Sequence, residues 1–279
     1  MPVKAEEIAQ LPKQIPTSPP GAAKREHTAT HHGITLSDSY HWLRDQSYPT
    51  VDDKEVLDHL KAENAWFEAR MASQQDRVET LFAEMRGRIK EADKSTPQKD
   101  GDWLYWIEYE EGAEYKKWWR RLVGAAADGS ADELILDETA LAKGKKYFRL
   151  GALSVSQNGM LLAYSTDTDG SERYTVRIKN LTTGKLLRDT IHGTLSSLVW
   201  VAGDKGIVYS LANENWRTDN SRLHWLGKPV SQDVELYREA DAGFQVGASI
   251  SANEKWVIIS AGDYETTEVR LVPAADPLA

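Results

Sequence analysis

The stretch ALSVSQNGMLLAYS, residues 152–165, decides the fold of this chain of 279 residues. β-Prone segments lie on both sides of Asn158-Gly159, at residues 152–156 and 161–165. Both turn residues accept a positive φ, so the pair is a strong signal for a tight hairpin. A third β-prone segment follows at residues 174–178. The stretch therefore predicts an antiparallel sheet of consecutive strands.

The same plan recurs along the chain, and its period identifies the architecture. Ser165, Ser210 and Ser260 end corresponding strands at a spacing of roughly 45 to 50 residues, which is the period of a four-stranded β-propeller blade. The final group has no outer fourth strand before the sequence stops. The expected strands are residues 103–109, 115–121, 134–137, 152–156, 161–165, 174–178, 186–189, 197–201, 207–210, 222–226, 234–237, 247–251, 256–260 and 268–272.

These groups predict a mainly β fold that ends in an incomplete β-propeller, with three blades and most of a fourth. A propeller closes its ring with roughly 4 to 8 blades, and an open arc leaves blade faces without neighbours. We therefore expect this chain to be the front portion of a longer protein. On this prediction the propeller portion occupies residues 95–279.

Two further segments precede the propeller. Residues 1–25 form a Pro-rich leader that we expect to be extended or disordered, because proline restricts itself and its predecessor. Residues 26–94 hold an aromatic arm and two helices. The first helix is expected to begin at Pro49-Thr50, with Thr50 as its cap, and the second to span about residues 75–91. Each has an apolar stripe typical of a packing surface. The leader prolines are Pro2, Pro12, Pro16, Pro19 and Pro20.

The arm contains the stretch HGITLSDSYHWLRD, residues 32–45. Tyr40 and Trp42 carry large apolar surfaces that favour burial, so the stretch is not a free tail. One interpretation is an ordered arm that packs on the domain following it. The other is a clamp between two domains, in which Trp42 is the anchor and Arg44 and Asp45 pair with groups at the seam. Tyr40, Trp42, Arg44 and Asp45 are therefore the candidate inter-domain contacts.

Composition limits the partners and the compartment. The net charge of −9 disfavours nucleic-acid binding, which depends mainly on Lys and Arg. The chain has no Cys, which excludes disulfides and thiolate metal sites and leaves a lean towards the cytoplasm. No stretch approaches the roughly 20 apolar residues of a membrane helix, and we expect no membrane partner.

A linked run of motifs extends along nearly the whole chain. Its members are Pro19-Pro20, Ala22, His32-Gly33, Asp38, Tyr40, Trp42-Leu43-Arg44-Asp45, Leu60, Ala62-Glu63-Asn64, Met71-Ala72, residues 85–91, residues 112–115 and residues 266–271. This run resembles the N-terminal portion of the oligopeptidase B enzymes in the prolyl oligopeptidase family of serine peptidases. The resemblance implies a seven-bladed propeller that limits access to short peptides, and a separate α/β-hydrolase domain that cuts after Arg or Lys.

The catalytic machinery that the resemblance implies does not occur in this sequence. A hydrolase of this type places its Ser in a Gly-x-Ser-x-Gly elbow, and none is present. Ser249 follows Gly247 at the right step, but Ser251 occupies the place of the second Gly. His31 and His32 lack the spacing of a metal motif, and we expect His32 to support the turn at Gly33 instead.

We therefore expect no catalytic, cofactor or metal residues in this chain, and no activity from it alone. The partners implied by the resemblance are the missing hydrolase domain and, for the complete enzyme, short peptide substrates. The alternative is a stand-alone, non-catalytic interaction module of the β-propeller type.

Overall fold

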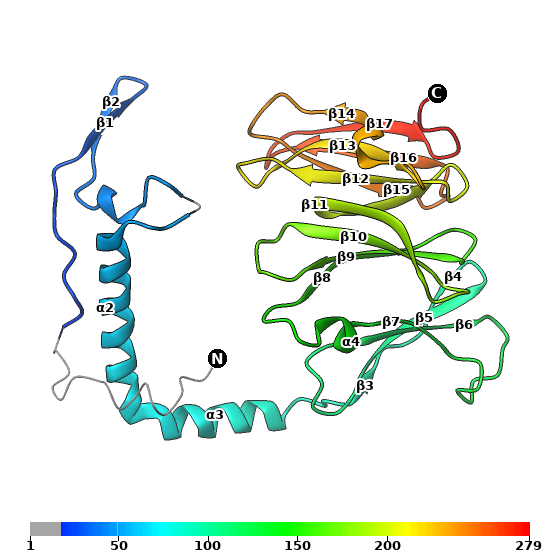
Figure 1. Ribbon diagram of the computed structural model, residues 1–279, viewed down its shortest axis with the longest axis horizontal. Coiled ribbons are helices and arrows are strands. Elements are labelled where there is room, and N and C mark those ends of the chain that lie inside the picture. The colour runs from blue at the N-terminus through cyan, green and yellow to red at the C-terminus, as the bar shows by residue number, and fades with distance from the viewer. Residues whose placement is uncertain (1–17, 49) are drawn as a thin grey trace. The chain divides into compact units, whose positions relative to one another are not determined.

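A computed structural model describes residues 18–48 and 50–279. The chain divides into two units, residues 1–90 and residues 91–279. Figure 1 shows a hairpin and helices in the first unit and stacked β-sheets in the second. The predictions about Pro2, Pro12, Pro16 and Pro49 lie outside the described residues.

The arm of the first unit contains a β-hairpin that the sequence pattern did not predict. Strands β1 (Thr28–His31) and β2 (Ile34–Ser37) pair antiparallel around His32-Gly33. The φ angles are 52° at His32 and 78° at Gly33. Two successive positive φ values suit the twist of a two-residue hairpin turn, so His32 does help to form the turn at Gly33.

The first helix begins later than predicted, and the second ends earlier. Helix α2 spans Lys54–Met71, and Asp53 caps it by accepting hydrogen bonds from the N–H groups of Glu55 and Val56. The prediction that Thr50 is the cap was wrong. The reason is Asp45, whose carboxylate accepts the backbone N–H groups of Asp52 and Asp53 and holds them outside the helix. The other helical segments are η1 (His41–Leu43), η2 (Ala72–Gln74) and α3 (Gln75–Gly87).

Only part of the apolar surface of these helices is covered within the first unit. Val56 and Ala69 of α2 are buried. Leu81, Phe82 and Met85 of α3, by contrast, are each more than half exposed.

The second unit contains four groups of antiparallel strands, which we number blades 1 to 4 (Figure 1). This arrangement confirms the prediction of three blades and most of a fourth. Blade 1 holds β3 (Asp93–Lys94), β4 (Gln98–Asp100), β5 (Trp103–Tyr109), β6 (Lys117–Leu122) and β7 (Glu133–Asp137), followed by helix α4 (Glu138–Ala142); blade 2 holds β8 (Arg149–Val155), β9 (Leu161–Asp167), β10 (Tyr174–Asn180) and the first part of β11 (Leu186–Val201); blade 3 holds the rest of β11, β12 (Gly206–Ala212), β13 (Thr218–Trp225), η3 (Val230–Gln232) and β14 (Val234–Arg238); and blade 4 holds β15 (Gln245–Ile250), β16 (Trp256–Gly262) and β17 (Thr267–Pro273).

Strand β11 joins blades 2 and 3 into one seven-stranded sheet. The sequence predicted two separate strands at residues 186–189 and 197–201, and both lie within β11. Its first part pairs with β10 and its last part with β12. Gly193 has a φ of 74°, and the register shifts between Thr194 and Leu198. The strand therefore bends from one blade into the next without a loop.

The core lies between the blades. One buried cluster joins blades 1 and 2 and contains Ile135 and Leu162. A second joins blades 2 and 3 around Ile178, and a third joins blades 3 and 4 around Leu223. Because each blade buries its faces against its neighbours, the first strands of successive blades are held close together.

Candidate functional site

One strand from the start of each blade lines a common surface of the second unit. These strands are β4, which follows the short β3 in blade 1, and β8, the last part of β11 and β15, which begin blades 2 to 4; we call them the first strands. Strand β11 contacts both β8 and β15. A hollow lies at each end of these strands.

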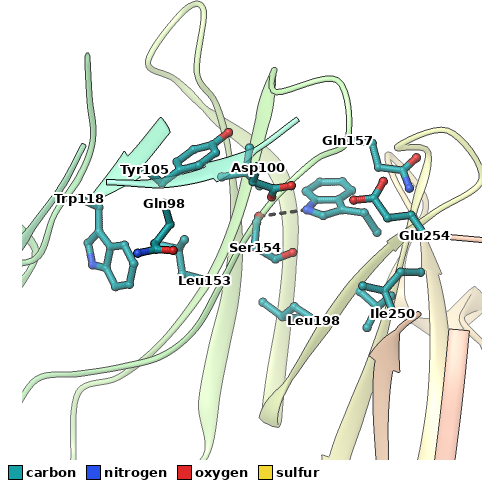
Figure 2. Close-up of a pocket in the computed structure, with 13 residues that line it drawn as sticks. Gln98, Asp100, Tyr105, Trp118, Leu153, Ser154, Gln157, Leu198, Ile250 and Glu254 are labelled. Carbon is teal, nitrogen blue, oxygen red and sulfur yellow. Dashed lines mark hydrogen bonds between the residues drawn. The ribbon is translucent and has the colours of Figure 1, made fainter. Parts of the chain in front are cut away.

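The hollow at the C-terminal ends of the first strands has a volume of about 360 Å³ and receives residues from all four blades. We call it the first-strand hollow (Figure 2). Its lining combines aromatic, aliphatic, amide and acidic side chains. The residues are Gln98, Asp100, Tyr105, Trp118, Leu153, Ser154, Val155, Gln157, Leu198, Val199, Trp200, Ile250 and Glu254.

Hydrogen bonds fix two of its aromatic rings. The indole N–H of Trp200 donates to the carbonyl of Ser154 at 3.0 Å. The indole N–H of Trp118 donates to Oε1 of Glu138 at 2.7 Å. Burial raises the pKa of the Tyr105 hydroxyl, and the nearby Arg120 guanidinium opposes that rise. The rings are thus held in place before any ligand arrives.

The acidic side chains of this hollow are not used by the fold. Asp100 and Glu254 are exposed, and Figure 2 shows both carboxylates in the hollow. Neither has an ion-pair partner within residues 18–48 and 50–279. The site therefore presents negative charge beside fixed aromatic rings.

The second hollow, of about 400 Å³, lies at the N-terminal ends of the first strands. Its two charged side chains already form an ion pair, with 3.1 Å between Nη1 of Arg149 and Oε1 of Glu172. The buried hydroxyl of Ser210 also lines it and has no hydrogen-bond partner among the described residues. Burial raises the pKa of the Tyr174 hydroxyl at its wall.

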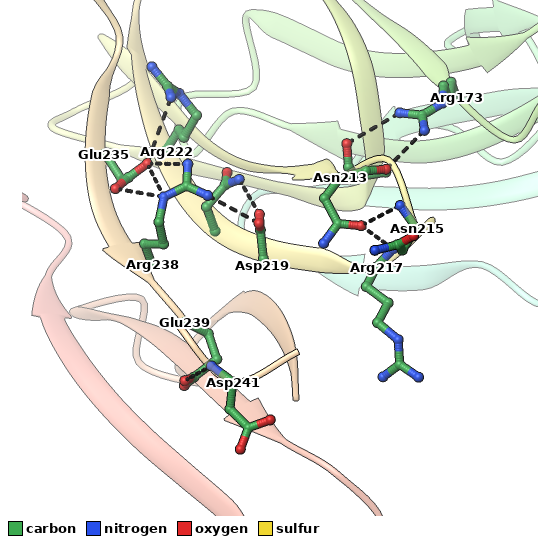
Figure 3. A network of polar contacts seen from close by, with 12 residues as sticks. Arg173, Asn213, Asn215, Arg217, Asp219, Arg222, Glu235, Arg238, Glu239 and Asp241 are labelled. Atoms are coloured by element: carbon green, nitrogen blue, oxygen red, sulfur yellow. Dashed lines mark hydrogen bonds and ion pairs between the residues drawn. The ribbon is translucent and has the colours of Figure 1, made fainter. Parts of the chain in front are cut away.

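A polar network ties the loops at this end together (Figure 3). The Arg173 guanidinium donates to the carbonyls of Ala212 and Asn213 at 3.2 and 2.9 Å. Arg238 pairs with Glu235 at 2.6 Å and with Asp219 at 3.1 Å. The Arg173 contacts link blade 2 to blade 3, and the Arg238–Asp219 pair joins the end of β14 to the start of β13.

His224 is the one fully buried histidine among the described residues, and each of its ring nitrogens contacts an Asp carboxylate. Its Nδ1 lies 2.7 Å from Asp233 Oδ1, and its Nε2 lies 3.1 Å from Asp189 Oδ1. The Tyr209 hydroxyl donates to the other oxygen of Asp233 at 2.7 Å. Neither ring nitrogen faces a Ser hydroxyl, so the cluster is a structural clasp between blades 2 and 3.

The four arm residues make contacts inside the first unit. Trp42 donates to the carbonyl of Ala23 at 2.7 Å, and Arg25 lies over its ring. Asp45 is nearly buried and binds backbone N–H groups of Ser47, Asp52 and Asp53.

Tyr40 is exposed, and the Arg44 guanidinium lies 5.4 Å from the ring centre of Tyr48. Their role at a domain seam stays a prediction. Within the described part of the chain, no group of three His, Cys, Asp or Glu side chains is placed to hold a metal ion.

Residues 19–279 match the model of the prolyl oligopeptidase N-terminal β-propeller domain. The chain belongs to the prolyl oligopeptidase family. This confirms the resemblance drawn from the motifs, and it identifies residues 19–279 with the N-terminal β-propeller domain of this family.

Relatives and solved structures of the family match this chain over most of its length. The chain is 36% identical over 274 residues to dipeptidyl aminopeptidase BI of Pseudoxanthomonas mexicana, a match that covers 93% of this chain and 38% of the relative. It is 26% identical to protease 2 of Moraxella lacunata, again over 38% of that protein.

The structure of oligopeptidase B from Leishmania major superposes with a TM-score of 0.85 at 27% identity, covering 95% of this chain and 39% of that one. Oligopeptidase B from Trypanosoma brucei gives a TM-score of 0.82 at 30% identity, with coverage of 92% and 38%. The chain thus spans under two fifths of the length of these family members. No described helix is long and apolar enough to cross a membrane.

The sequence did not reveal the first-strand hollow. Its members come from residues as far apart as Gln98 and Glu254, and no local motif marks them. The available signal was the blade repeat, because residues 152–156, 197–201 and 247–251 occupy equivalent first strands.

Proposed function

We propose that this chain supplies the N-terminal arm, helices and propeller portion of a serine oligopeptidase that cleaves short peptides after Arg or Lys. In this proposal the propeller restricts access to the active site. The arm and the helices pack on a catalytic α/β-hydrolase domain. The observation that carries the proposal is the family match over residues 19–279, together with the share of the relatives that it covers.

Two features of the structure support the packing role. The apolar face of α3 is largely exposed, as the exposed fractions of 64% for Phe82 and 66% for Met85 indicate. Exposed apolar patches of this kind mark surfaces that bind another protein surface. In the arm, Tyr40 and Arg44 are exposed and available for the same interface, whereas Asp45 is committed to the start of α2.

Complementation tests the proposal. This chain is co-expressed with the C-terminal segment of the Pseudoxanthomonas relative that follows the matched portion, and the complex is purified on a tag carried by this chain. We expect hydrolysis of an N-blocked chromogenic Arg-amide by the complex and none by this chain alone. Activity of the repurified chain alone would overturn the proposal, as would failure of the two segments to associate. A Phe82→Glu/Met85→Glu variant should lose the association, and Glu84→Gln on the same helix should keep it.

A second candidate activity rests on the 36% identity to a protein named dipeptidyl aminopeptidase. That name denotes release of dipeptides from a free amino terminus. A Gly-Arg-amide with a free amino group and its N-acetylated counterpart separate the two activities. Cleavage between Arg and the reporter in both substrates supports the endopeptidase. Cleavage of the free form only supports the dipeptidyl aminopeptidase.

A further inference from the structure

We propose that the first-strand hollow is a second, non-catalytic binding site for the cationic side chain of a peptide, Arg or Lys. The proposal deepens the proposed function, on which it rests for the choice of ligand, because an oligopeptidase for basic peptides meets such side chains. It assigns to blades 1 to 4 a site that contributes no group to catalysis.

Charge complementarity selects a cation as the occupant. Asp100 on β4 and Glu254 after β15 bring two carboxylates to the hollow from opposite ends of the arc of blades. No Lys or Arg is among the residues that line it. The second hollow differs, because Arg149 there already neutralises Glu172. An incoming guanidinium or ammonium group therefore gains ion pairs in the first-strand hollow without displacing an existing one.

Lys99 and Lys255 are exposed neighbours of Asp100 and Glu254 in the sequence but are not among the residues that line the hollow, and two further cations of blade 1 are engaged in other contacts. Arg120, which faces Tyr105, pairs with Glu133 at 2.8 Å and lies 3.7 Å from the ring centre of Trp103. Lys116 lies 4.8 Å from the ring centre of Trp118. These contacts hold Arg120 and Lys116 on residues of blade 1, and neither cation lines the hollow.

The remaining lining suits the stem of a long cationic side chain. Leu153, Leu198 and Ile250 offer aliphatic surface on three neighbouring blades. Arg and Lys bury their methylene stems on such surfaces while the charged head stays hydrated. The Trp200 ring, 4% exposed and fixed through its N–H bond to Ser154, forms part of the wall beside these side chains. The volume of about 360 Å³ lies within the range of roughly 300–1,000 Å³ typical of small-ligand pockets.

Calorimetry with the full chain tests the proposal. The probe is N-acetyl-Ala-Arg-Ala-amide, and the matched ligand replaces Arg by citrulline, which keeps the shape and removes the charge. We expect the Arg peptide to bind at least fivefold more tightly at low salt, and to lose most of that advantage in 0.5 M salt because exposed charges are then screened. Equal binding of the two peptides overturns the proposal.

Matched variants locate the site. Asp100→Asn/Glu254→Gln should weaken the Arg peptide at least fivefold. Glu114→Gln/Glu265→Gln removes the same charge from exposed positions outside the hollow and should leave binding within twofold. An equal loss in both double variants means general attraction to an acidic protein and refutes the site. The Arg peptide should also shift the indole N–H resonance of Trp200, assigned with Trp200→Phe, and an unshifted resonance contradicts the proposal.

This test is independent of catalysis. If the Arg peptide fails to bind while the co-expressed complex hydrolyses Arg-amides, the binding site is wrong and the proposed function stands. If the peptide binds as expected and the two segments fail to associate, the proposed function is wrong and the binding site stands.

Discussion

The clearest test of how the blades are held together is Tyr209→Phe. This change removes one hydroxyl from the clasp of Tyr209, His224, Asp189 and Asp233. The hydroxyl donates to Asp233 at 2.7 Å, and the Tyr209 side chain is 1% exposed. Burial, with help from the Asp233 carboxylate, raises the pKa of this hydroxyl, so it stays a donor throughout the physiological pH range.

The expected cost follows from the chemistry of the acceptor. A buried hydrogen bond to a charged group contributes about 1.5–3 kcal/mol to the free energy of unfolding, and its loss leaves one oxygen of Asp233 without a donor. We therefore expect Tyr209→Phe to lower the free energy of unfolding by about 2 kcal/mol. For a unit of this size that corresponds to a melting temperature about 4–8 °C lower.

The assay is urea unfolding followed by circular dichroism, with Tyr237→Phe as the matched control. Tyr237 also donates to a carboxylate, that of Glu239, but the pair is only partly buried. Its loss should therefore cost less than about 1 kcal/mol. Equal costs for the two variants would refute the reasoning. A cycle with His224→Gln should be non-additive by about 0.5–3 kcal/mol, because both side chains bind the same carboxylate.

Three further outcomes are expected. Asp204→Asn should lower the free energy of unfolding by about 1–2 kcal/mol, measured in urea, because the carboxylate accepts N–H groups of two residues in the adjacent blade at 2.9 and 3.0 Å. The N–H groups of Asp53 and then Ser47 hold the pKa of Asp45 far below its usual value of 3.8. The contribution of Asp45 to the stability of the folded chain is therefore complete above pH 3.8 and is lost as the pH falls below that value. Asp45→Asn should remove this acid sensitivity from the circular dichroism of the chain. In hydrogen exchange, β17 should be the least protected strand of blade 4, because it is an edge strand among the described residues and is more exposed than the other edge strand, β15; protection equal to that of β16 would contradict this.

The strands were predictable because their pattern is local. The β-prone segments and the Asn158-Gly159 turn between them place β8 and β9 within a residue or two of their observed limits, except that β8 starts earlier, at Arg149. The helix start was not predictable from its own residues. Thr50 is a suitable cap in isolation. Asp53 caps the helix instead, because the carboxylate of Asp45 binds the backbone N–H groups of Asp52 and Asp53.

The prediction of two separate strands in place of β11 was wrong for a related reason. Residues 186–189 and 197–201 belong to different blades, and a repeat pattern treats the segment between them as a loop. Gly193 with its φ of 74° lets the backbone turn while its neighbours keep pairing, Thr194 with both Tyr174 and Leu211. Pairing on two sides is a tertiary property, and the local alternation of residues carries no signal for it.

The first-strand hollow follows from these inter-blade contacts rather than from any one blade. Its walls are first strands whose spacing is set by polar bonds that cross from blade to blade. Lys179 Nζ of blade 2 donates to the Ile135 carbonyl of blade 1 at 2.8 Å, and Asp204 of blade 3 binds the N–H of Gln157 in blade 2. Burial lowers the pKa of Lys179, which is the cost of placing an ammonium group at such a seam. A variant that loosens a seam should therefore alter peptide binding in the hollow even when no lining residue has changed, which joins the stability of the blades to the chemistry of the site.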